Sequence, residues 1–366
     1  MKMGSWIMLV LASGVASMAQ AANDCADYWQ KEQSYTQGQT VSHLGRNYRA
    51  NWWTYAMRPD RVESRSEWSD LGQCSYPQHS VFELPGEQLQ ALTSPSMTVG
   101  TRYRIHVRLP ADYQPQRAYP VLYVADWSWL GQRETMQALL MEFEGRDVPL
   151  AQWRSVPEQV AEAQSAGEAA PVILVGIECP DELGPCLVRR SRDLTPTHSA
   201  AEDDYIRSWL MPDLSPTQQV SGGGANFGRF IRESVIPSVE RRFKADPHQR
   251  GWLGTSLAGL WGADQLLNHD RLFSRYLLNS PSLWYDNMAT LQRTASQSAA
   301  SLAGVQQLYL SIGAEETQER PLLEEYATVL AQRQLNPHTR IIPDASHLLA
   351  PAQASRLGLP KVYPAK

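Results

Sequence analysis

Beyond its first residues the sequence has no long hydrophobic run, so we expect no membrane-spanning helix and no membrane partner. Met1–Ala21 contains Lys2, the apolar stretch Trp6–Leu11 and Ala19-Gln20-Ala21, which is the pattern of a secretory signal peptide with its cleavage site. The apolar stretch is too short to cross a bilayer. We therefore expect a soluble, secreted protein, either extracellular or periplasmic.

The sequence also lacks an excess of positive charge. It has 33 Lys and Arg against 38 Asp and Glu, which gives a net charge of −5. The basic residues are scattered along the chain. Proteins that bind nucleic acid gather basic residues on one face, so we expect no nucleic-acid partner. The Cys and His residues have none of the spacings typical of zinc sites, and we expect neither a metal nor a cofactor.

Only four cysteines occur in 366 residues. An even number suits disulfide bonds in an oxidising compartment. Four cysteines allow three pairings, and nearness along the chain favours Cys25–Cys74 and Cys179–Cys186.

The length of the chain is too great for one small core, so we expect more than one domain. Residues 23–75 are rich in Tyr and Trp and poor in aliphatic residues. Turn signals at Gln37-Gly38-Gln39 and Leu44-Gly45-Arg46 predict a small β module in this segment. Residues 76–96 lack a strong period and are predicted to be a linker, and residues 97–366 form the second domain.

The aromatic residues of the first segment divide between core and surface. Successive side chains of a strand over Tyr48–Thr54 would alternate between its two faces, so they cannot all point inward. We assign Tyr48 and Trp68 to the core. Exposed rings can stack on pyranose rings, and those expected to bind carbohydrate are Trp52 or Trp53, together with Tyr35 or Tyr55. The competing interpretation is that all these rings form the core of a module poor in Leu and Ile.

The order of aromatic, glycine and cysteine positions in this segment resembles the small chitin- and cellulose-binding modules of bacterial chitinases. The positions that carry the resemblance are Tyr35, Gly38, Val41, Gly45, Tyr48–Thr54, Pro59, Trp68, Leu71-Gly72 and Cys74. The resemblance covers the whole segment and implies a chitin-like polysaccharide as a partner.

After Met97, strand patterns alternate with helical patterns. Thr101–Leu109 alternates like an antiparallel strand. Strands buried on both faces are predicted at Tyr119–Ala125, Pro171–Ile177, Arg250–Gly254 and Gln307–Ile312, and helices at Pro157–Ser165, Asn226–Phe243, Leu257–Leu267 and Pro321–Arg333. This alternation predicts an α/β fold with a mainly parallel central sheet, which binds ligands at the carboxyl ends of its strands.

One such strand end carries Gly254-Thr255-Ser256-Leu257-Ala258. This is close to the G-x-S-x-G nucleophile elbow, in which a sharp strand-to-helix turn exposes a serine hydroxyl. Ala258 replaces the second glycine and is small enough for the turn. The sequence predicts Ser256 as a nucleophile, and the alternative is a simple Gly/Ser turn.

Five separated motifs, in the right order, look like the esterase D-like and enterochelin-esterase-like α/β hydrolases. They are Arg104–Tyr123 with Asp126, Arg190–Thr197, Ser221–Ala225 with Phe227–Pro237, Gly254–Gly259, and Asn279–Trp284. The enterochelin-esterase-like branch fits best, because of the RSRDLTPT and SGGG stretches. The resemblance covers about residues 97–349 and implies an α/β-hydrolase fold with serine esterase activity.

In this fold the nucleophile, the acid and the histidine follow one another along the chain. Of the histidines after Ser256, His269 lies too close to the elbow's own helix, and His338 precedes the predicted strand Thr339–Ile342. His347 follows that strand in a loop and is the expected base. The competing interpretation is a surface histidine.

The acid is expected after the strand Gln307–Ile312, where Gly313-Ala314-Glu315-Glu316 offers two carboxylates. The spacing usual in the resembling family, a glycine, two residues and the acid, selects Glu316. Glu315 remains a second choice, and a solvated acidic turn is the competing interpretation.

An oxyanion hole needs two backbone N–H groups. One is expected from Leu257 and the other from the loop around Asp126-Trp127. The resembling family has Asp-Gly here, so we expect the bulky Trp127 to narrow or reshape the cleft.

Three charged residues and one ring have open roles. Arg190, Arg192 and Asp193 are interpreted as a structural ion-pair cluster, with substrate orientation as the alternative. Trp284 either lines the pocket or is buried.

Together these patterns predict a secreted carboxylic-ester hydrolase tethered to a chitin-like polysaccharide. One alternative is a siderophore or small-ester hydrolase that uses the module only as an anchor. The other is a carbohydrate-binding protein whose hydrolase domain is inactive.

Overall fold

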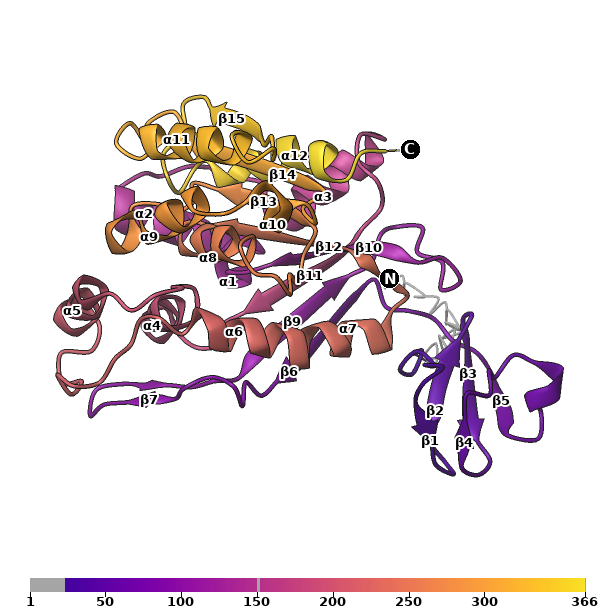
Figure 1. Cartoon of the computed structure of the whole chain (residues 1–366). Helices are drawn as coiled ribbons and strands as arrows, with labels where there is room; N and C mark the ends of the chain where they lie inside the picture. Colours follow the sequence, from indigo (N-terminus) through magenta and orange to yellow (C-terminus); the bar gives the residue numbers. More distant parts are fainter. Residues whose placement is uncertain (1–23, 150–151, 366) are drawn as a thin grey trace, which may run out of the picture.

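The computed structural model describes residues 24–149 and 152–365. The predicted signal peptide, residues 1–21, lies outside the described residues. Figure 1 shows two parts, a large α/β part and a small β module set beyond one end of its sheet. The two-part architecture matches the predicted α/β fold with a small N-terminal β module.

The centre of the α/β part is an eight-stranded sheet with the order β15-β14-β13-β12-β10-β11-β9-β6. All neighbours from β11 to β15 are parallel, whereas β9 and β6 pair antiparallel at one edge. The strands are β6 His79–Leu84, β9 Tyr103–Arg108, β10 Tyr119–Val124, β11 Ile173–Glu178, β12 Ala245–Thr255, β13 Arg275–Asn279, β14 Gln307–Gly313 and β15 His338–Ile342. The mainly parallel sheet confirms the predicted topology.

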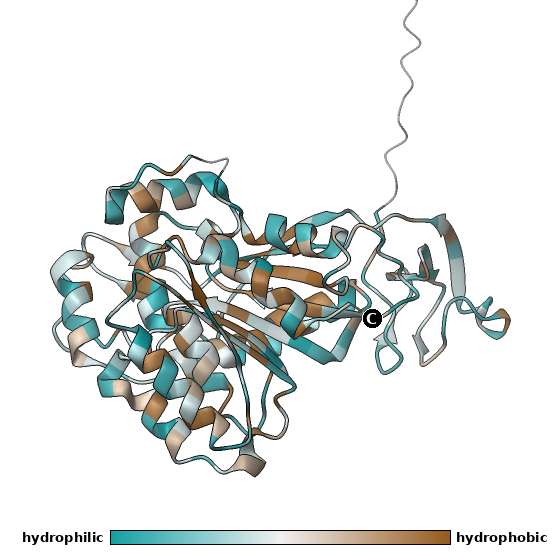
Figure 2. Cartoon of the chain, turned by 90° about the horizontal axis from the view of Figure 1, so that it is seen from above, coloured by the Kyte–Doolittle hydropathy of each residue, from teal (hydrophilic) through white to brown (hydrophobic). Residues whose placement is uncertain are grey.

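Helices cover both faces of this sheet. They are α1 Trp127–Leu130, α2 Arg133–Glu144, α3 Val156–Ser165, α4 Leu183–Asp193, α5 Ala200–Trp209, α6 Gly224–Phe230, the π-helical turn Ile231–Val235, α7 Ile236–Arg242, α8 Leu257–Gln265, α9 Tyr285–Ala295, α10 Ala299–Leu302, α11 Arg320–Ala331 and α12 Pro351–Val362. Trp252 packs with α6, α8 and α11 on one face, and its neighbour Leu253 packs with α1, α3 and α12 on the other. Figure 2 shows the hydrophobic residues concentrated in the strands between these layers.

The module consists of a three-stranded antiparallel sheet, β2-β3-β5, and a two-stranded ladder, β1-β4. Its elements are β1 Ser34–Tyr35, β2 Thr40–His43, β3 Arg46–Ala50, β4 Thr54–Tyr55, the 3-10 turn η1 Val62–Ser64 and β5 Trp68–Gln73. The core confirms the assignment of Tyr48 and Trp68 to the interior. Trp52, Trp53 and Tyr55 are 50%, 63% and 50% exposed.

Tyr35 differs from the expectation that it could lie on the surface. Its side chain is only 3% exposed, and its ring packs edge-on against Trp68. The backbone N–H of Gln30 donates to the Tyr35 hydroxyl over 2.7 Å. Tyr35 is therefore a core residue, and of the two tyrosines only Tyr55 has an exposed ring.

Both predicted disulfides are present. Cys25–Cys74 closes the module over a separation of 49 residues, and Cys179–Cys186 joins the region after β11 to α4. The four cysteines are thereby all paired.

The module packs directly against the α/β part, near the end of α7. The backbone N–H of Tyr28 donates to the carbonyl of Arg241, and the Gln30 side chain donates to the carbonyl of Glu240 over 3.0 Å. The Lys244 ammonium lies 5.0 Å from the centre of the Tyr28 ring. These contacts immediately precede β12, so the module lies at the amino end of that strand (Figure 1).

The predicted linker, residues 76–96, is partly regular structure. It supplies β6, which pairs with β9 along its whole length, and β7 Leu92–Thr93, which pairs with β8 Thr98–Val99. The alternating exposure along β6 reflects its position at the sheet edge. Within the described part of the chain, no helix has the length and apolar character needed to span a membrane.

Candidate active site

Ser256 lies at the carboxyl end of the sheet, between the end of β12 and the start of α8. Its backbone has φ 59° and ψ −122°, a region that non-glycine residues rarely adopt. A side chain on Gly254 would collide with the carbonyl of Ala258, which explains the need for glycine there. The chain therefore makes the predicted sharp turn and places the hydroxyl at the edge of the sheet.

His347 and Glu316 meet at the same edge. Glu316 follows β14, and its carboxylate lies 2.6 Å from His347 Nδ1. It also accepts from the Ser280 hydroxyl at 2.6 Å and from the Gly313 backbone N–H at 2.8 Å. Burial alone would raise the pKa of Glu316, but the hydrogen bonds and charge of these partners outweigh it and hold the pKa below its ordinary value.

The neighbouring glutamate and the other candidate histidines lie elsewhere. Glu315 is exposed and forms an ion pair with Arg146. His338 begins the edge strand β15 and is exposed, and His269 is exposed beyond α8. The structure thus brings Glu316 and His347 together, and leaves the alternatives outside.

Ser256 and His347 both line a pocket of about 380 Å³. Its walls are mostly apolar and come from α1, α2, α4, α5 and the segment after β15. The lining residues are Asp126, Trp129, Leu130, Met136, Leu139, Phe143, Glu144, Leu187, Arg190, Tyr205, Thr255, Ser256, His347, Leu348 and Pro351. The Ser256 hydroxyl lies 3.3 Å from that of Ser282, and among the hydrogen bonds of the described residues none joins Ser256 to His347.

The two amides expected in the oxyanion hole both stand at the start of a helix. Leu257 and Trp127 are the first residues of α8 and α1, and the first amide of a helix has no acceptor within it. Asp126 precedes α1 in the left-handed region, with φ 56°. This turn exposes the amino end of α1 at the carboxyl end of β10.

The expectation that Trp127 narrows the cleft is wrong. Its side chain is buried, fills the space above Gly176 and stacks on His106 with 5.5 Å between ring centres. It is not part of the pocket wall. A side chain on Gly176 would collide with this indole. The large side chain of Trp127 therefore requires glycine at position 176.

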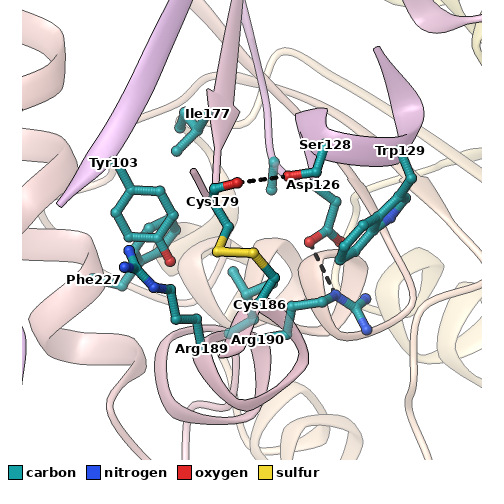
Figure 3. A pocket seen from close by; sticks show the side chains of 12 residues that line it. Tyr103, Asp126, Ser128, Trp129, Ile177, Cys179, Cys186, Arg189, Arg190 and Phe227 are labelled. Atoms are coloured by element: carbon teal, nitrogen blue, oxygen red, sulfur yellow. Dashed lines mark hydrogen bonds and ion pairs between the residues drawn. A yellow bond between two sulfur atoms is a disulfide. The ribbon is translucent and has the colours of Figure 1, made fainter. Parts of the chain in front are cut away.

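An ion pair and a disulfide flank this turn, as Figure 3 shows. Arg190 donates to the Asp126 carboxylate over 2.9 Å and lies 5.2 Å from the Trp129 ring centre. Burial raises the pKa of Asp126, and the Arg190 charge offsets only part of that effect. The Ser128 hydroxyl donates to the carbonyl of Cys179 over 3.1 Å, which ties α1 to the Cys179–Cys186 bridge.

The three charged residues at the end of α4 lie in different environments. Arg192 and Asp193 form a buried ion pair, and Asp193 also accepts from the Tyr103 hydroxyl at 2.7 Å. This supports their structural interpretation, whereas Arg190 reaches the pocket. Trp284 was expected either to line the pocket or to be buried. Both expectations are wrong, because its side chain is 51% exposed and does not contribute to the pocket wall.

The sequence did not reveal the wall formed by α2 or the partners of Glu316. The apolar residues Met136, Leu139 and Phe143 have helical spacing and could have indicated α2. Ser280 lies in the NSPSLW motif but carries no distinguishing signal of its own. Among the described residues, no group of three or more His, Cys, Asp or Glu side chains is arranged to hold a metal ion.

Comparison with known families identifies the module. Residues 28–69 match the model of carbohydrate-binding module family 5/12. The match covers most of the β module, including Tyr48, Trp52, Trp53 and Trp68. It agrees with the predicted resemblance to chitin-binding modules.

Curated relatives of the α/β part are siderophore esterases. The chain is 27% identical over 218 residues to the ferri-bacillibactin esterase of Bacillus subtilis, covering 59% of this chain and 65% of the relative. It is 35% identical over 133 residues to the siderophore enterobactin esterase of Emericella nidulans, covering 35% and 42%. The matches span less than two thirds of these relatives' own lengths.

Solved structures share the fold. A protein from Bacillus cereus described as BES has a TM-score of 0.55 at 22% identity, covering 81% of this chain and 98% of that one. An enterobactin hydrolase in complex with DFP has a TM-score of 0.52 at 22% identity, covering 78% and 94%. The chain thus resembles the enterobactin and bacillibactin esterases, with an α/β-hydrolase fold behind an N-terminal module of family 5/12.

Proposed function

We propose that this protein is a secreted serine carboxylesterase whose N-terminal module holds it on chitin or a related polysaccharide. The observation that carries the proposal is that the partly buried elbow serine, Ser256, lines one pocket together with His347, whose imidazole is hydrogen-bonded to Glu316. The two disulfides suit an oxidising compartment outside the cytoplasm. For the domains we propose residues 23–75 as the module and 97–366 as the esterase domain, with residues 76–96 joining them and adding the edge strand β6 to the esterase sheet.

The proposed reaction forms and hydrolyses an acyl-enzyme. Ser256 Oγ attacks the ester carbonyl carbon, and His347 Nε2 takes the hydroxyl proton and then passes it to the leaving alcohol. Glu316 keeps the imidazole oriented through Nδ1. The amides of Leu257 and Trp127, with the turn at Asp126, stabilise the oxyanion. For attack, the Ser256 hydroxyl rotates from Ser282 toward His347.

The second step releases the acyl group. His347 takes a proton from water, and the hydroxide attacks the acyl-enzyme carbonyl; as the bond to Ser256 Oγ breaks, His347 returns the proton to that oxygen, which gives the carboxylic acid and free Ser256. The apolar wall from α1 and α2 suits an acyl or alcohol group that is apolar or carries a ring, because burial of such a group removes apolar surface from water.

For the substrate, we propose a diffusible ester, such as the ester bonds of a siderophore, with the module acting as an anchor. Two observations support this choice. The curated relatives are described as siderophore esterases. The module contacts the residues before β12, whereas Ser256 follows that strand, which spans roughly 20 Å because a bulge between Ala245 and Arg250 shortens it. A polysaccharide chain on the module therefore has its binding surface far from the pocket.

The direct test is hydrolysis of p-nitrophenyl acetate by purified protein and by the Ser256→Ala variant. We expect hydrolysis that the variant loses. A wild-type protein without activity on any soluble ester, yet retained on chitin, would favour the inactive carbohydrate-binding protein. A second assay compares a soluble tri-ester siderophore with a feruloylated polysaccharide. Faster cleavage of the polysaccharide ester would overturn the proposed substrate class.

A further inference from the structure

The carboxylate of Glu144 accepts hydrogen bonds from the residues on both sides of His347. Glu144 is the last residue of α2. One of its oxygens accepts from the Ser346 hydroxyl at 2.7 Å, and the other accepts from the backbone N–H of Leu348 at 3.3 Å. Its side chain is largely buried, so these bonds form in a partly desolvated place, where they are stronger than in water.

The same helix end is tied to the segment that carries the acid. Arg146 lies 3.5 Å from Glu144 and forms an ion pair with Glu315, the residue before Glu316. The short stretch Glu144–Arg146, at the end of α2 and just beyond it, thus contacts the neighbours of His347 and of Glu316.

The loop is anchored just before His347, where the buried Ala345 accepts from the backbone N–H of Glu315 over 3.0 Å, and the bonds to Glu144 continue this anchoring on both sides of the histidine. The residues between β15 and α12 form a turn with Asp344 in the left-handed region, at φ 51°. The imidazole itself is 40% exposed and is held through Nδ1 by Glu316. Rotation of the loop by a small angle would displace Nε2 from the Ser256 hydroxyl, and a shift of 1 Å in such a site can cost about a hundredfold in rate.

We propose that Glu144 is a positioning residue that fixes the His347 loop over Ser256. The proposal rests on the function proposed above. It also links substrate binding to the histidine, because Met136, Leu139 and Phe143 of the same helix line the pocket. A ligand that packs against this wall stabilises the helix position from which Glu144 holds the loop.

The test compares Glu144→Gln, Ser346→Ala and the double variant in hydrolysis of a soluble p-nitrophenyl ester. In Glu144→Gln the amide oxygen can still accept from the Leu348 N–H, but the Ser346 hydroxyl loses its charged acceptor and faces the amide NH2 group instead, so the charge-assisted bond is lost. We expect kcat to fall by about 10- to 100-fold, with KM changed by less than about threefold, since ground-state binding in the pocket persists. The double variant should be scarcely slower than Glu144→Gln, because the two residues act through one contact.

The matched control is Glu142→Gln, which removes a charge of the same sign from the exposed side of α2. It should keep wild-type kcat. Thermal unfolding of each variant shows whether it is folded, and Ser346→Ala serves alone if Glu144→Gln does not fold. Wild-type kcat in a folded Glu144→Gln, or a loss equal to that of Glu142→Gln, would overturn the proposal. Activity of the parent protein that survives Ser256→Ala would instead overturn the proposed function.

Discussion

The module and the α/β part distribute their exposed tryptophans differently. In the α/β part, Trp127, Trp252 and Trp261 are fully buried and fill the layers on either side of the sheet, and the exposed Trp209 and Trp284 are far apart in the sequence. In the module, Trp52 and Trp53 point outward, while Trp68 is buried in a small core closed by a disulfide. An outward ring adds little to folding, so the two adjacent exposed rings of the module are the ones whose loss should affect binding more than stability.

A second contrast lies in where the two parts place their reactive or binding groups. The serine, histidine and glutamate lie at the carboxyl end of the sheet, and the module lies at the amino end of β12. Binding to carbohydrate and cleavage of an ester should therefore be separable, so that each is lost without the other. The predictions below test this separation, from the largest expected effect to the smallest.

Ser256→Ala should abolish esterase activity, with a loss of about a millionfold in kcat, because the nucleophile is removed. His347→Ala combined with it should be scarcely worse than either change alone, since the residues act as a unit. Retention on insoluble chitin should be unchanged. Initial rates on p-nitrophenyl acetate and a chitin pull-down on the same preparations check both halves. Loss of chitin retention in Ser256→Ala would instead show that carbohydrate binding and ester cleavage share one site.

Glu316→Gln should lower kcat by about 10⁴-fold, because an amide cannot hold the imidazole in the required tautomer. Glu315→Gln is the matched control, and it removes the neighbouring exposed carboxylate. Rates on the same soluble ester decide between them. A larger loss in the Glu315 variant would move the acid by one residue.

Cys25→Ser with Cys74→Ser should destabilise the module by about 2–4 kcal/mol, because the bridge restrains the unfolded chain. We expect chitin retention to disappear at a lower urea concentration than in the wild type. Turnover of the soluble ester should keep its wild-type urea dependence. Parallel loss of both would mean that the module and the α/β part unfold together.

Trp52→Ala with Trp53→Ala should weaken retention on chitin by about 1 kcal/mol or more of binding free energy, because stacked rings are lost. Tyr35→Phe serves as the contrast, since that ring is internal and should leave retention unchanged. Binding isotherms on chitin measure the effect. Wild-type retention in the double variant would show that chitin binds to another surface. Slower ester turnover would show that these rings also contribute to the ester site.

Acid should weaken the α/β part through Glu316. The pKa of Glu316 lies below its ordinary value, so its contribution to stability is present above pH 4.5 and is lost as pH falls through the lowered pKa. The difference in unfolding free energy between wild type and Glu316→Gln should therefore shrink between about pH 6 and pH 3. Urea unfolding at the two pH values measures it. A difference that grows on acidification would reverse the sign of the effect.

Much of this architecture follows from local sequence patterns. Apolar runs such as Tyr119–Ala125 predicted the parallel strands, and the small residues around Ser256 predicted the turn. Nearness along the chain was enough to pair the cysteines correctly. These features depend on neighbours in sequence, so the sequence alone carries them.

The features that were missed depend on distant parts of the chain. Trp127 turns inward because Gly176, on another strand, leaves room for it. Alternation could not say which face of the module buries Tyr35, because the choice depends on Trp68. β6 was read as part of a linker because a half-exposed edge strand lacks an apolar run. The hydrogen bonds of Glu144 to the His347 loop connect residues about 200 positions apart, so no local sequence pattern predicts them.

The backbone of Ser256 has a consequence for how this protein balances folding against chemistry. A residue with a side chain at φ 59° and ψ −122° costs about 1–3 kcal/mol, which glycine would not incur. The position is therefore one where the best residue for stability and the best residue for reaction are different. Ser256→Gly should therefore raise the free energy of unfolding while it removes the reactive hydroxyl.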